Sequence, residues 1–392
     1  MYIVFTIVVI DLIGFGIIIP LLPFFGEHFG AEPHTVGFLM ATYSAGQLVA
    51  APFWGRLSDT VGRKPVLLTS LLGMSFAYIL MSFSQSLIIL FLSRAISGLM
   101  AGNISAAFAY VADITTPQDR AKGMGLVGAG FGIGFIIGPA IGGLLAGSDP
   151  NNANYQTPAL AAAGASFLAF TVCLFFLRES LDETHRSKLK TLSSNDRLNM
   201  LRETLLQPNV RLLLLISFVV TLVFASLESI FPIWSRRTFN WGPQQNGYLF
   251  AIVGIISVLI QGGCLGSLNK KFGEIRLIIG GMLLLAAGMA LIPFSLTLET
   301  IIPAMAISAI GFSIVSPSLN TAISIRIAET EQGGAMGAAR SVTTSSRMVG
   351  PALAGIIFGS LGKDWPFFIS ALVMLVLVAI ALRFFAAGIL SK

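Results

Sequence analysis

Runs of about twenty mostly apolar residues follow one another along almost the whole chain, separated by short polar turns. The hydrocarbon core of a bilayer is about 30 Å thick and an α-helix rises about 1.5 Å per residue, so each run predicts one membrane-spanning helix. The runs are continuous and do not alternate with polar residues, which excludes porin-like strands. Twelve helices are expected, at residues 2–25, 35–56, 65–83, 86–111, 123–146, 159–177, 211–234, 244–267, 276–295, 300–325, 335–360 and 366–388.

Charged residues are too few for a water-soluble fold of this size. Only 11% of the 392 residues are charged, whereas about 25% is usual in soluble domains. The net charge of +6 does not indicate a nucleic-acid partner, because the basic residues form short clusters between apolar runs. Cys173 and Cys264 lie singly in apolar stretches, so we expect no disulfide framework. The composition therefore predicts an all-α integral membrane protein whose surroundings are the lipid bilayer.

Lys and Arg residues are distributed unevenly between the two sets of loops. If the N-terminus is cytoplasmic, 18 of the 24 Lys and Arg residues fall in the inner loops and tails, and only Arg236, Arg237 and Lys363 fall in the outer loops. Short cytoplasmic loops are enriched in positive charge. We therefore expect both termini in the cytoplasm, and the short tails favour a bacterial inner membrane.

A single long polar connection divides the expected helices into two sets of six. We expect an N-terminal six-helix bundle at 1–178, a cytoplasmic linker at 179–209 and a C-terminal six-helix bundle at 210–392. Within the linker, Asn195 is a suitable N-cap for a short helix whose leucines fall on one face. Such a helix would lie on the membrane surface between the bundles.

Two motifs of the first half recur in the second half, displaced by nearly the same number of residues. The loop at 55–64 has a partial copy at 266–273, and the Gly-Pro segment that begins at Gly138 recurs at Gly350. Such a repeat predicts two homologous halves related by a pseudo-two-fold axis along the membrane normal. A cavity between the halves is where a transporter of this design binds its substrate.

At these motifs the sequence resembles the major facilitator superfamily over essentially its whole length. The loop at 55–64 is similar to the superfamily signature between helices 2 and 3, and the glycines of helix 5 resemble the antiporter motif of twelve-helix drug/proton antiporters. The segment 11–16 resembles the tetracycline-efflux-like branch, and Arg94 with Gly98 and Gly102 resembles a motif associated with proton transfer. The resemblance implies two pseudo-symmetric six-helix bundles and proton-coupled export by alternating access.

The sequence departs from the family pattern in two places, of which the one in the third helix concerns the cargo. The second copy of the loop has Asn269 near the place of the acidic residue, and the third expected helix has no acidic residue, whereas tetracycline/proton antiporters carry one there. Tetracycline is therefore the less favoured substrate. The motifs do not identify another.

The loop after the second helix combines glycines, an acid and two bases at a spacing that suits a gate. Asp59 can pair with the positive end of a neighbouring helix or with an arginine, and so hold the cytoplasmic side shut. The resemblance implies that this loop steadies the outward-open state against the start of helix 11. A tight turn with basic anchors is the alternative. The expected gate residues are Gly55, Asp59, Gly62, Arg63 and Lys64.

Glycine recurs at every fourth residue in the fifth expected helix. Residues at this spacing share one helix face, which lets another helix approach closely. Proline within the same helix adds a kink or hinge. We expect this glycine face to pack against a neighbouring helix, to seal the contact and to let the two helices rock against each other. Plain helix packing without such a function is the alternative. The antiporter motif implied by the resemblance comprises Gly130, Gly134, Gly138, Pro139, Gly142 and Gly143.

Three ionisable residues within the first, fourth and seventh helices are expected to couple transport to protons. They are Asp11, Arg94 and Glu228. Ionisable groups inside a bilayer are costly and mark functional sites. We expect Asp11 to bind and release the proton, with Arg94 holding it ionised or alternating with it, and Glu228 assisting. The alternative is a static buried ion pair.

Two arginines of the eleventh helix form a second candidate site. Arg340 and Arg347 share a face about 10 Å apart along the axis. With Arg94 they give one more positive charge than the two buried acids balance, so a substrate carboxylate or phosphate would fit. Alternatively, Arg340 pairs with Asp59 or Asp113. Both interpretations stay open.

Other polar residues give weaker indications. Four at membrane depth are expected to line the substrate cavity, although interhelical hydrogen bonds explain them equally well: Gln47, Asn103, Gln261 and Asn320. Four in the first outer loop are expected to be solvated rather than to bind a metal: Glu27, His28, Glu32 and His34.

The sequence shows no nucleophile–base–acid constellation and no phosphate-binding loop, so we expect neither an enzyme nor an ATP-driven pump. The leading hypothesis is a monomeric secondary transporter that exports a small amphipathic compound or drug in exchange for protons. It needs no cofactor, because the proton gradient supplies the energy. A second hypothesis is a proton-coupled transporter of an organic anion or metabolite recognised by the helix-11 arginines. A third is a membrane receptor or scaffold that kept the fold without transporting.

Overall fold

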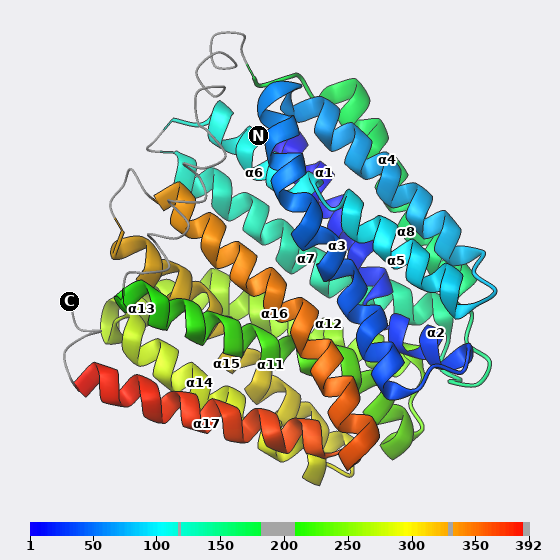
Figure 1. The fold of residues 1–392 in the computed structure, drawn as a ribbon, viewed down its shortest axis with the longest axis vertical. Helices are drawn as coiled ribbons and strands as arrows, with labels where there is room; N and C mark the ends of the chain where they lie inside the picture. The colour runs from blue at the N-terminus through cyan, green and yellow to red at the C-terminus, as the bar shows by residue number, and fades with distance from the viewer. Residues whose placement is uncertain (117–118, 182–207, 328–331, 387–392) are drawn as a thin grey trace. The chain divides into compact units, whose positions relative to one another are not determined.

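The computed structural model describes residues 1–116, 119–181, 208–327 and 332–386, and every regular element within them is a helix (Figure 1). The expected surface helix near Asn195 lies outside these residues. In chain order the elements are α1 Tyr2–Ile18, α2 Leu22–His28, α3 Pro33–Thr60, α4 Arg63–Ser82, α5 Leu87–Met100, α6 Asn103–Ile114, α7 Arg120–Ala146, α8 Gln156–Phe176, α11 Pro208–Phe239, α12 Pro243–Leu259, the π-helix η1 Ile260–Cys264, α13 Leu265–Phe272, α14 Glu274–Leu291, the 3₁₀-helix η2 Ile292–Phe294, α15 Leu298–Ile325, α16 Gln332–Leu361 and α17 Trp365–Ala386.

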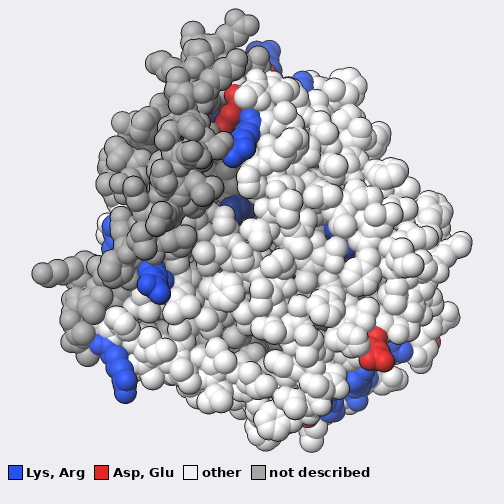
Figure 2. Space-filling view, viewed as in Figure 1, with Lys and Arg blue, Asp and Glu red and all other residues white. Residues whose placement is uncertain are grey.

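Within the described residues, 11 helical segments are long and apolar enough to cross a membrane. They coincide with eleven of the twelve expected spans to within a few residues at each end. The remaining span, expected at 335–360, is the 30-residue helix α16. Its polar run at 340–347 makes it less apolar than the others. The predicted all-α membrane fold is confirmed, and the face of the protein in Figure 2 accordingly shows few charged side chains among broad uncharged areas.

The chain forms two compact units. Unit 1 comprises Met1–Thr191 with Phe231–Gly254, and unit 2 comprises Leu192–Ile230 with Ile255–Lys392. Helices α11 and α12 therefore each contribute residues to both units. The division into bundles expected from the linker follows chain order and stays a prediction.

In unit 1, helix α1 packs against α7 and α8, while α4 packs against α8 and α3 against α5. Buried apolar side chains form two clusters along these contacts. Tyr43 and Tyr78 belong to one cluster, and Trp54 and Leu71 belong to the other. The close packing of α1 and α7 depends on the glycines of α7, as described below.

In unit 2, helix α14 packs against α15 and α17. Small residues again allow close approach: a Cβ added to Gly311 of α15 would lie 2.6 Å from the carbonyl oxygen of Gly281 on α14. Gly350 of α16 lies similarly against α11, since its added Cβ would be 2.6 Å from the Leu222 carbonyl oxygen. Gly350 is the counterpart of Gly138 in the internal repeat, and Gly138 packs against α1 in the same manner.

Two expected helices are interrupted. The first breaks between α1 and α2 around Pro20, which lacks the N–H that a continuous helix needs. The fourth breaks between α5 and α6, where Ala101 has φ −73° and ψ 35°. Both helices were expected to be continuous. The second break lies beside the buried carboxyl group of Asp11.

Candidate functional site

Asp11 lies in the apolar helix α1 and is only 3% exposed. Its carboxylate accepts hydrogen bonds from two neutral side chains, Nδ2 of Asn103 on α6 and Oγ of Ser166 on α8, the latter at 3.1 Å. A small apolar cavity between α1, α4 and α6 adjoins it. Among the described residues, no basic side chain forms an ion pair with Asp11. This carboxyl group can therefore gain or lose a proton without leaving a partner charge unpaired.

Arg94 lies on α5, 3% exposed, and does not contact Asp11. Its guanidinium carbon is 4.7 Å from the centre of the Tyr43 ring, a cation–π contact. Nε and Nη1 of Arg94, and the Tyr78 hydroxyl, find no hydrogen-bond partner among the described residues. Tyr78 interacts electrostatically with both Asp11 and Arg94. The expected direct Asp11–Arg94 pair is therefore not formed. Tyr78 is a charge-sensitive neighbour of both residues.

Glu228, the third residue expected to couple protons, forms an ion pair within unit 2. Nη1 of Arg347 on α16 lies 3.0 Å from its Oε2, and the Glu228 side chain is 8% exposed. The charge of Arg347 therefore balances that of Glu228. Arg340 lies on an exposed part of α16, and its suggested pairing with Asp59 or Asp113 stays a prediction.

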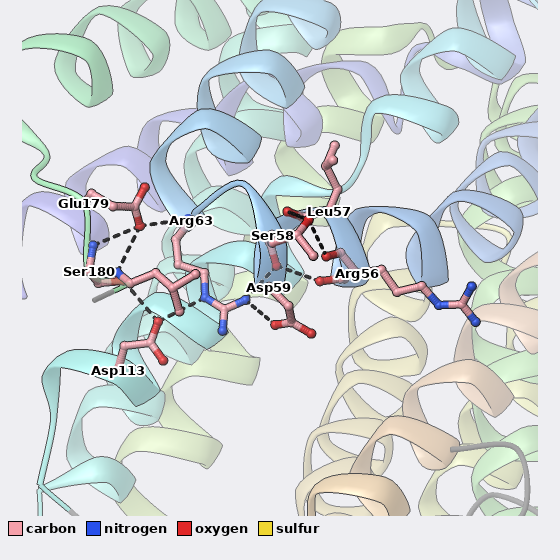
Figure 3. Close-up of polar contacts among 11 residues, drawn as sticks. Arg56, Leu57, Ser58, Asp59, Arg63, Asp113, Glu179 and Ser180 are labelled. Atoms are coloured by element: carbon pink, nitrogen blue, oxygen red, sulfur yellow. Dashed lines mark hydrogen bonds and ion pairs between the residues drawn. The ribbon is translucent and has the colours of Figure 1, made fainter. Parts of the chain in front are cut away.

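Arg63 is the centre of the expected gate loop (Figure 3). Its guanidinium group donates to Oδ1 of Asp59 at 2.7 Å and to Oδ2 of Asp113 at 3.0 Å, and also to the Ser58 hydroxyl at 2.7 Å. Gly62 has φ +124°, which strongly favours glycine, and this conformation starts α4 directly after the turn. The pairing of Asp59 with a nearby arginine, one of the two expected partners, is thus present inside unit 1. The role of this network in gating stays a prediction.

Glu179, which follows α8, binds the start of α4 (Figure 3). Its carboxylate accepts the backbone N–H of Arg63 at 2.9 Å and of Lys64 at 3.1 Å. A carboxylate at a helix N-terminus satisfies free N–H groups and interacts well with the helix dipole. Ser180 extends the contact by donating to Asp113 at 3.0 Å. Glu179 was not expected from the sequence, because nothing local in the sequence indicates a cap supplied by a distant segment.

The glycine face of α7 lies directly against α1. Added Cβ atoms on Gly134, Gly138 and Gly142 would lie 2.7, 2.6 and 2.3 Å from atoms of α1. Gly130 is less tightly packed, at 3.3 Å. On another face of α7, a Cβ on Gly143 would lie 2.8 Å from the Pro243 carbonyl oxygen, and a Cβ on Gly247 of α12 would lie 2.3 Å from the Pro139 carbonyl oxygen. These glycines thus serve two helix contacts, while their part in sealing stays a prediction.

The four polar residues expected to line a cavity lie in different environments. Asn103 is buried against Asp11, whereas Gln47 is partly exposed. Gln261 and Asn320 are exposed in unit 2, and Gln261 belongs to the π-helix η1.

Gly55 and Lys64 are the remaining residues of the expected gate. Nζ of Lys64 donates to the Leu174 carbonyl oxygen at 2.8 Å.

The expectation of a solvated side chain was wrong for Glu27, whereas the other three residues of that loop are exposed or partly exposed. The Glu27 side chain is only 11% exposed and accepts Nη1 of Arg236, from the end of α11 in unit 1, at 2.9 Å. Arg236 also donates to Asn151 at 3.2 Å. The Tyr155 ring stacks on Phe25 beside this pair, with centroids 4.7 Å apart. Burial raises the pKa of Tyr155 to about 12, with nearby Arg236 opposing and Glu27 adding to the shift, so its hydroxyl stays neutral.

The described residues include no group of three or more His, Cys, Asp or Glu side chains that could hold a metal ion. Long apolar helices, ionisable groups buried inside them and tight glycine contacts define a polytopic membrane protein with a polar network in its helix bundle.

Comparison with family models identifies the family. The model described as Major Facilitator Superfamily matches residues 4–350 and, in an overlapping match, residues 264–388. The chain belongs to the major facilitator superfamily.

Two relatives in this family match more than nine tenths of the chain. The tetracycline resistance protein, class E, of Escherichia coli is 32% identical over 391 residues, covering 98% of this chain and 94% of that protein. Multidrug resistance protein 2 of Bacillus subtilis is 32% identical over 370 residues, covering 93% and 90%.

Solved structures show the same fold. That of the human organic anion transporter MFSD10 (TETRAN) has a TM-score of 0.74 at 24% identity, covering 97% of this chain and 98% of its own. A POT family transporter in complex with 5-aminolevulinic acid has a TM-score of 0.81 at 16% identity, covering 100% and 96%.

Proposed function

We propose that the chain is a secondary active transporter that exports small amphipathic compounds or drugs in exchange for protons. The observation that carries this proposal is the environment of Asp11: it is buried in a membrane-spanning helix and bonded to the neutral side chains of Asn103 and Ser166. An intramembrane carboxyl group in such a setting is suited to bind and release a proton during a transport cycle. The relatives named for tetracycline and multidrug resistance support a drug-like cargo.

In the proposed cycle, proton and substrate occupy the protein alternately. Substrate binding favours release of the proton from Asp11, and proton binding from the opposite side favours release of the substrate. The proton gradient is the energy source, so no cofactor takes part. The Arg63 network and the glycine face of α7 would hold and guide the helices during alternating access.

The proposed setting is a bacterial inner membrane, with both termini in the cytoplasm and a monomer as the working form. The excess of Lys and Arg in the inner loops supports this orientation. The partners are a small-molecule substrate, protons and lipid. We expect no nucleic-acid partner and no enzymatic activity.

Pairing of Arg347 with Glu228 reduces the case for an organic-anion cargo, because the charge of Arg347 is already balanced. The experiment below distinguishes the drug/proton antiporter from an anion transporter and from a receptor that does not transport.

The experiment uses purified protein in liposomes with an acidic interior and an internal pH dye. Tetraphenylphosphonium, chloramphenicol and p-aminohippurate represent a lipophilic cation, a neutral drug and an organic anion. We expect the cation or the neutral drug to evoke proton efflux with the wild type, and Asp11→Asn to abolish it while the protein still folds. Efflux evoked only by the anion would favour the second candidate. Silence with all three compounds would contradict drug/proton antiport, and equal efflux in the variant would remove Asp11 from the mechanism.

A further inference from the structure

The break in the fourth membrane-spanning helix lies between the buried residues Arg94 and Asn103. Helix α5 ends at Met100, and α6 begins at Asn103. A break at this depth frees backbone carbonyl groups that lipid cannot satisfy, and each unsatisfied group would be costly. The break can therefore persist only if other groups bond these carbonyl oxygens, and the backbone N–H of Gly102 already bonds that of Met100 at 2.8 Å.

Two buried side chains from neighbouring helices do so. Nε1 of Trp54 on α3 donates to the Leu99 carbonyl oxygen at 2.5 Å. The hydroxyl of Ser70 on α4 donates to the Met100 carbonyl oxygen and accepts the backbone N–H of Asn103 at 2.9 Å. Trp54 is 5% exposed and Ser70 is fully buried. Together they bond both sides of the break.

The same break orients Asn103 toward Asp11. Oδ1 of Asn103 accepts the backbone N–H of Ile104 at 2.9 Å, which leaves the amide Nδ2 to donate to Asp11. The position of this donor is thus fixed by the first turn of α6, and the first turn is held by Ser70.

We propose that Trp54 and Ser70 are positioning residues of the proton site, which hold the helix break so that Asn103 bonds the Asp11 carboxylate. The inference rests on the proposed function and adds two residues that contact neither proton nor substrate. Through them, the break sets the pH at which the transporter exchanges its proton.

Few other groups near Asp11 could change the pH at which it exchanges its proton. Ser166 faces it from α8, and Tyr78 of α4 interacts with it electrostatically. Along 123–146 the packed helix α7 contains no ionisable side chain. The remaining ionisable groups of α6 and α8 have other neighbours than Asp11. Asp113 pairs with Arg63, and Tyr110 interacts with Asp113, Cys173 and Glu179.

The test compares Ser70→Ala with Ser75→Ala, a matched control on the same helix. Ser75 is also buried and also donates to a backbone carbonyl oxygen, that of Ala163 at 3.0 Å, but it does not touch the break. Trp54→Phe is the second test variant, since it keeps an aromatic ring and removes the N–H donor.

The readout is the pH profile of substrate-evoked proton release in liposomes. A donor to the carboxylate favours its charged form, so weakening that donor lets Asp11 keep its proton to higher pH. We expect Ser70→Ala and Trp54→Phe to move the alkaline limb of the profile upward by about half to one pH unit. Ser75→Ala should leave the limb in place, and all three variants should bind the compound with wild-type affinity.

The outcomes separate this inference from the proposed function. If the wild type couples and Asp11→Asn does not, while Ser70→Ala, Trp54→Phe and Ser75→Ala share one wild-type profile, the function stands and the positioning role is wrong. If the wild type itself releases no protons, the proposed function fails.

A second measurement needs no variant at the break. Hydrogen exchange of the wild-type amides at 98–104 should be slower above the pH of proton release than below it, because the charged carboxylate holds Asn103 more firmly. Asp11→Asn should remove this pH dependence beyond the ordinary chemical exchange rate. The same protection at every pH in the wild type would overturn the inference, even if Ser70→Ala and Trp54→Phe failed to fold.

Discussion

At the residue scale, the buried groups Asp11, Glu228 and Arg63 differ in the kind of partner that bonds them. Asp11 is bonded by neutral donors, whereas Glu228 and Arg63 are bonded by opposite charges. Removing the charge of one member of an ion pair leaves the other member uncompensated, at a cost. Neutral donors impose no such penalty, so Asp11 is the group best suited to change its protonation state, and Glu228 is better suited to a structural role.

Replacement of Arg347 by Gln tests this distinction. We expect Arg347→Gln to lower the free energy of unfolding by about 1 to 3 kcal/mol, because Glu228 then stays buried without its cationic partner. Thermal unfolding in detergent, followed by Trp fluorescence, measures the change.

The double variant Glu228→Gln, Arg347→Gln is the control, since it removes both charges at once. It should recover part of the lost stability. Losses that simply add in the double variant would mean that the two side chains do not interact energetically.

Sequence alone identified Asp11 and Asn103 as buried polar groups but not their contact. Ser166 and Glu179 were missed, because their partners lie far away in the chain and no local spacing marks them. Glu27 was wrongly expected to be solvated, since its partner Arg236 belongs to another helix.

At the element scale, glycine faces decide how closely helices approach. The contact of α7 with α1 leaves no room for a Cβ at Gly138, whereas one at Gly128 on the same helix would meet nothing within 4 Å. Helices in lipid have no hydrophobic driving force toward one another. Small residues favour their association because they allow close van der Waals packing.

Gly138→Ala should therefore destabilise the protein by about 1 to 3 kcal/mol through overpacking. Gly128→Ala is the matched control and should be neutral or slightly stabilising, because alanine favours a helix over glycine. Thermal unfolding of the two variants side by side measures the difference. Equal midpoints would show that the α1–α7 contact is not tight.

The positions of the helices followed from their apolar runs, because length and hydropathy are local properties. The two helix breaks could not be predicted from the apolar runs in the same way. Pro20 marks one of them locally, but the break before Asn103 exists because Trp54 and Ser70 bond its backbone from other helices. Such support is a property of tertiary structure and leaves no local pattern in the sequence.

At the scale of the whole molecule, the internal repeat gives the two halves similar parts with different chemistry. Gly138 and Gly350 pack in the same way, each within its own unit. The first half carries the carboxyl group with neutral partners, and the second carries the Glu228–Arg347 pair. We infer that proton exchange belongs to the first half, which is the central claim of the mechanism.

Uphill transport tests this claim most directly. Wild type and Asp11→Asn are placed in liposomes with an acidic interior, and accumulation of the compound that evokes proton efflux is compared with its exchange in the absence of a pH gradient. We predict that the wild type accumulates the compound, while Asp11→Asn exchanges it at a comparable rate and accumulates none. Accumulation by Asp11→Asn equal to that of the wild type would contradict the assignment of Asp11 as the proton carrier.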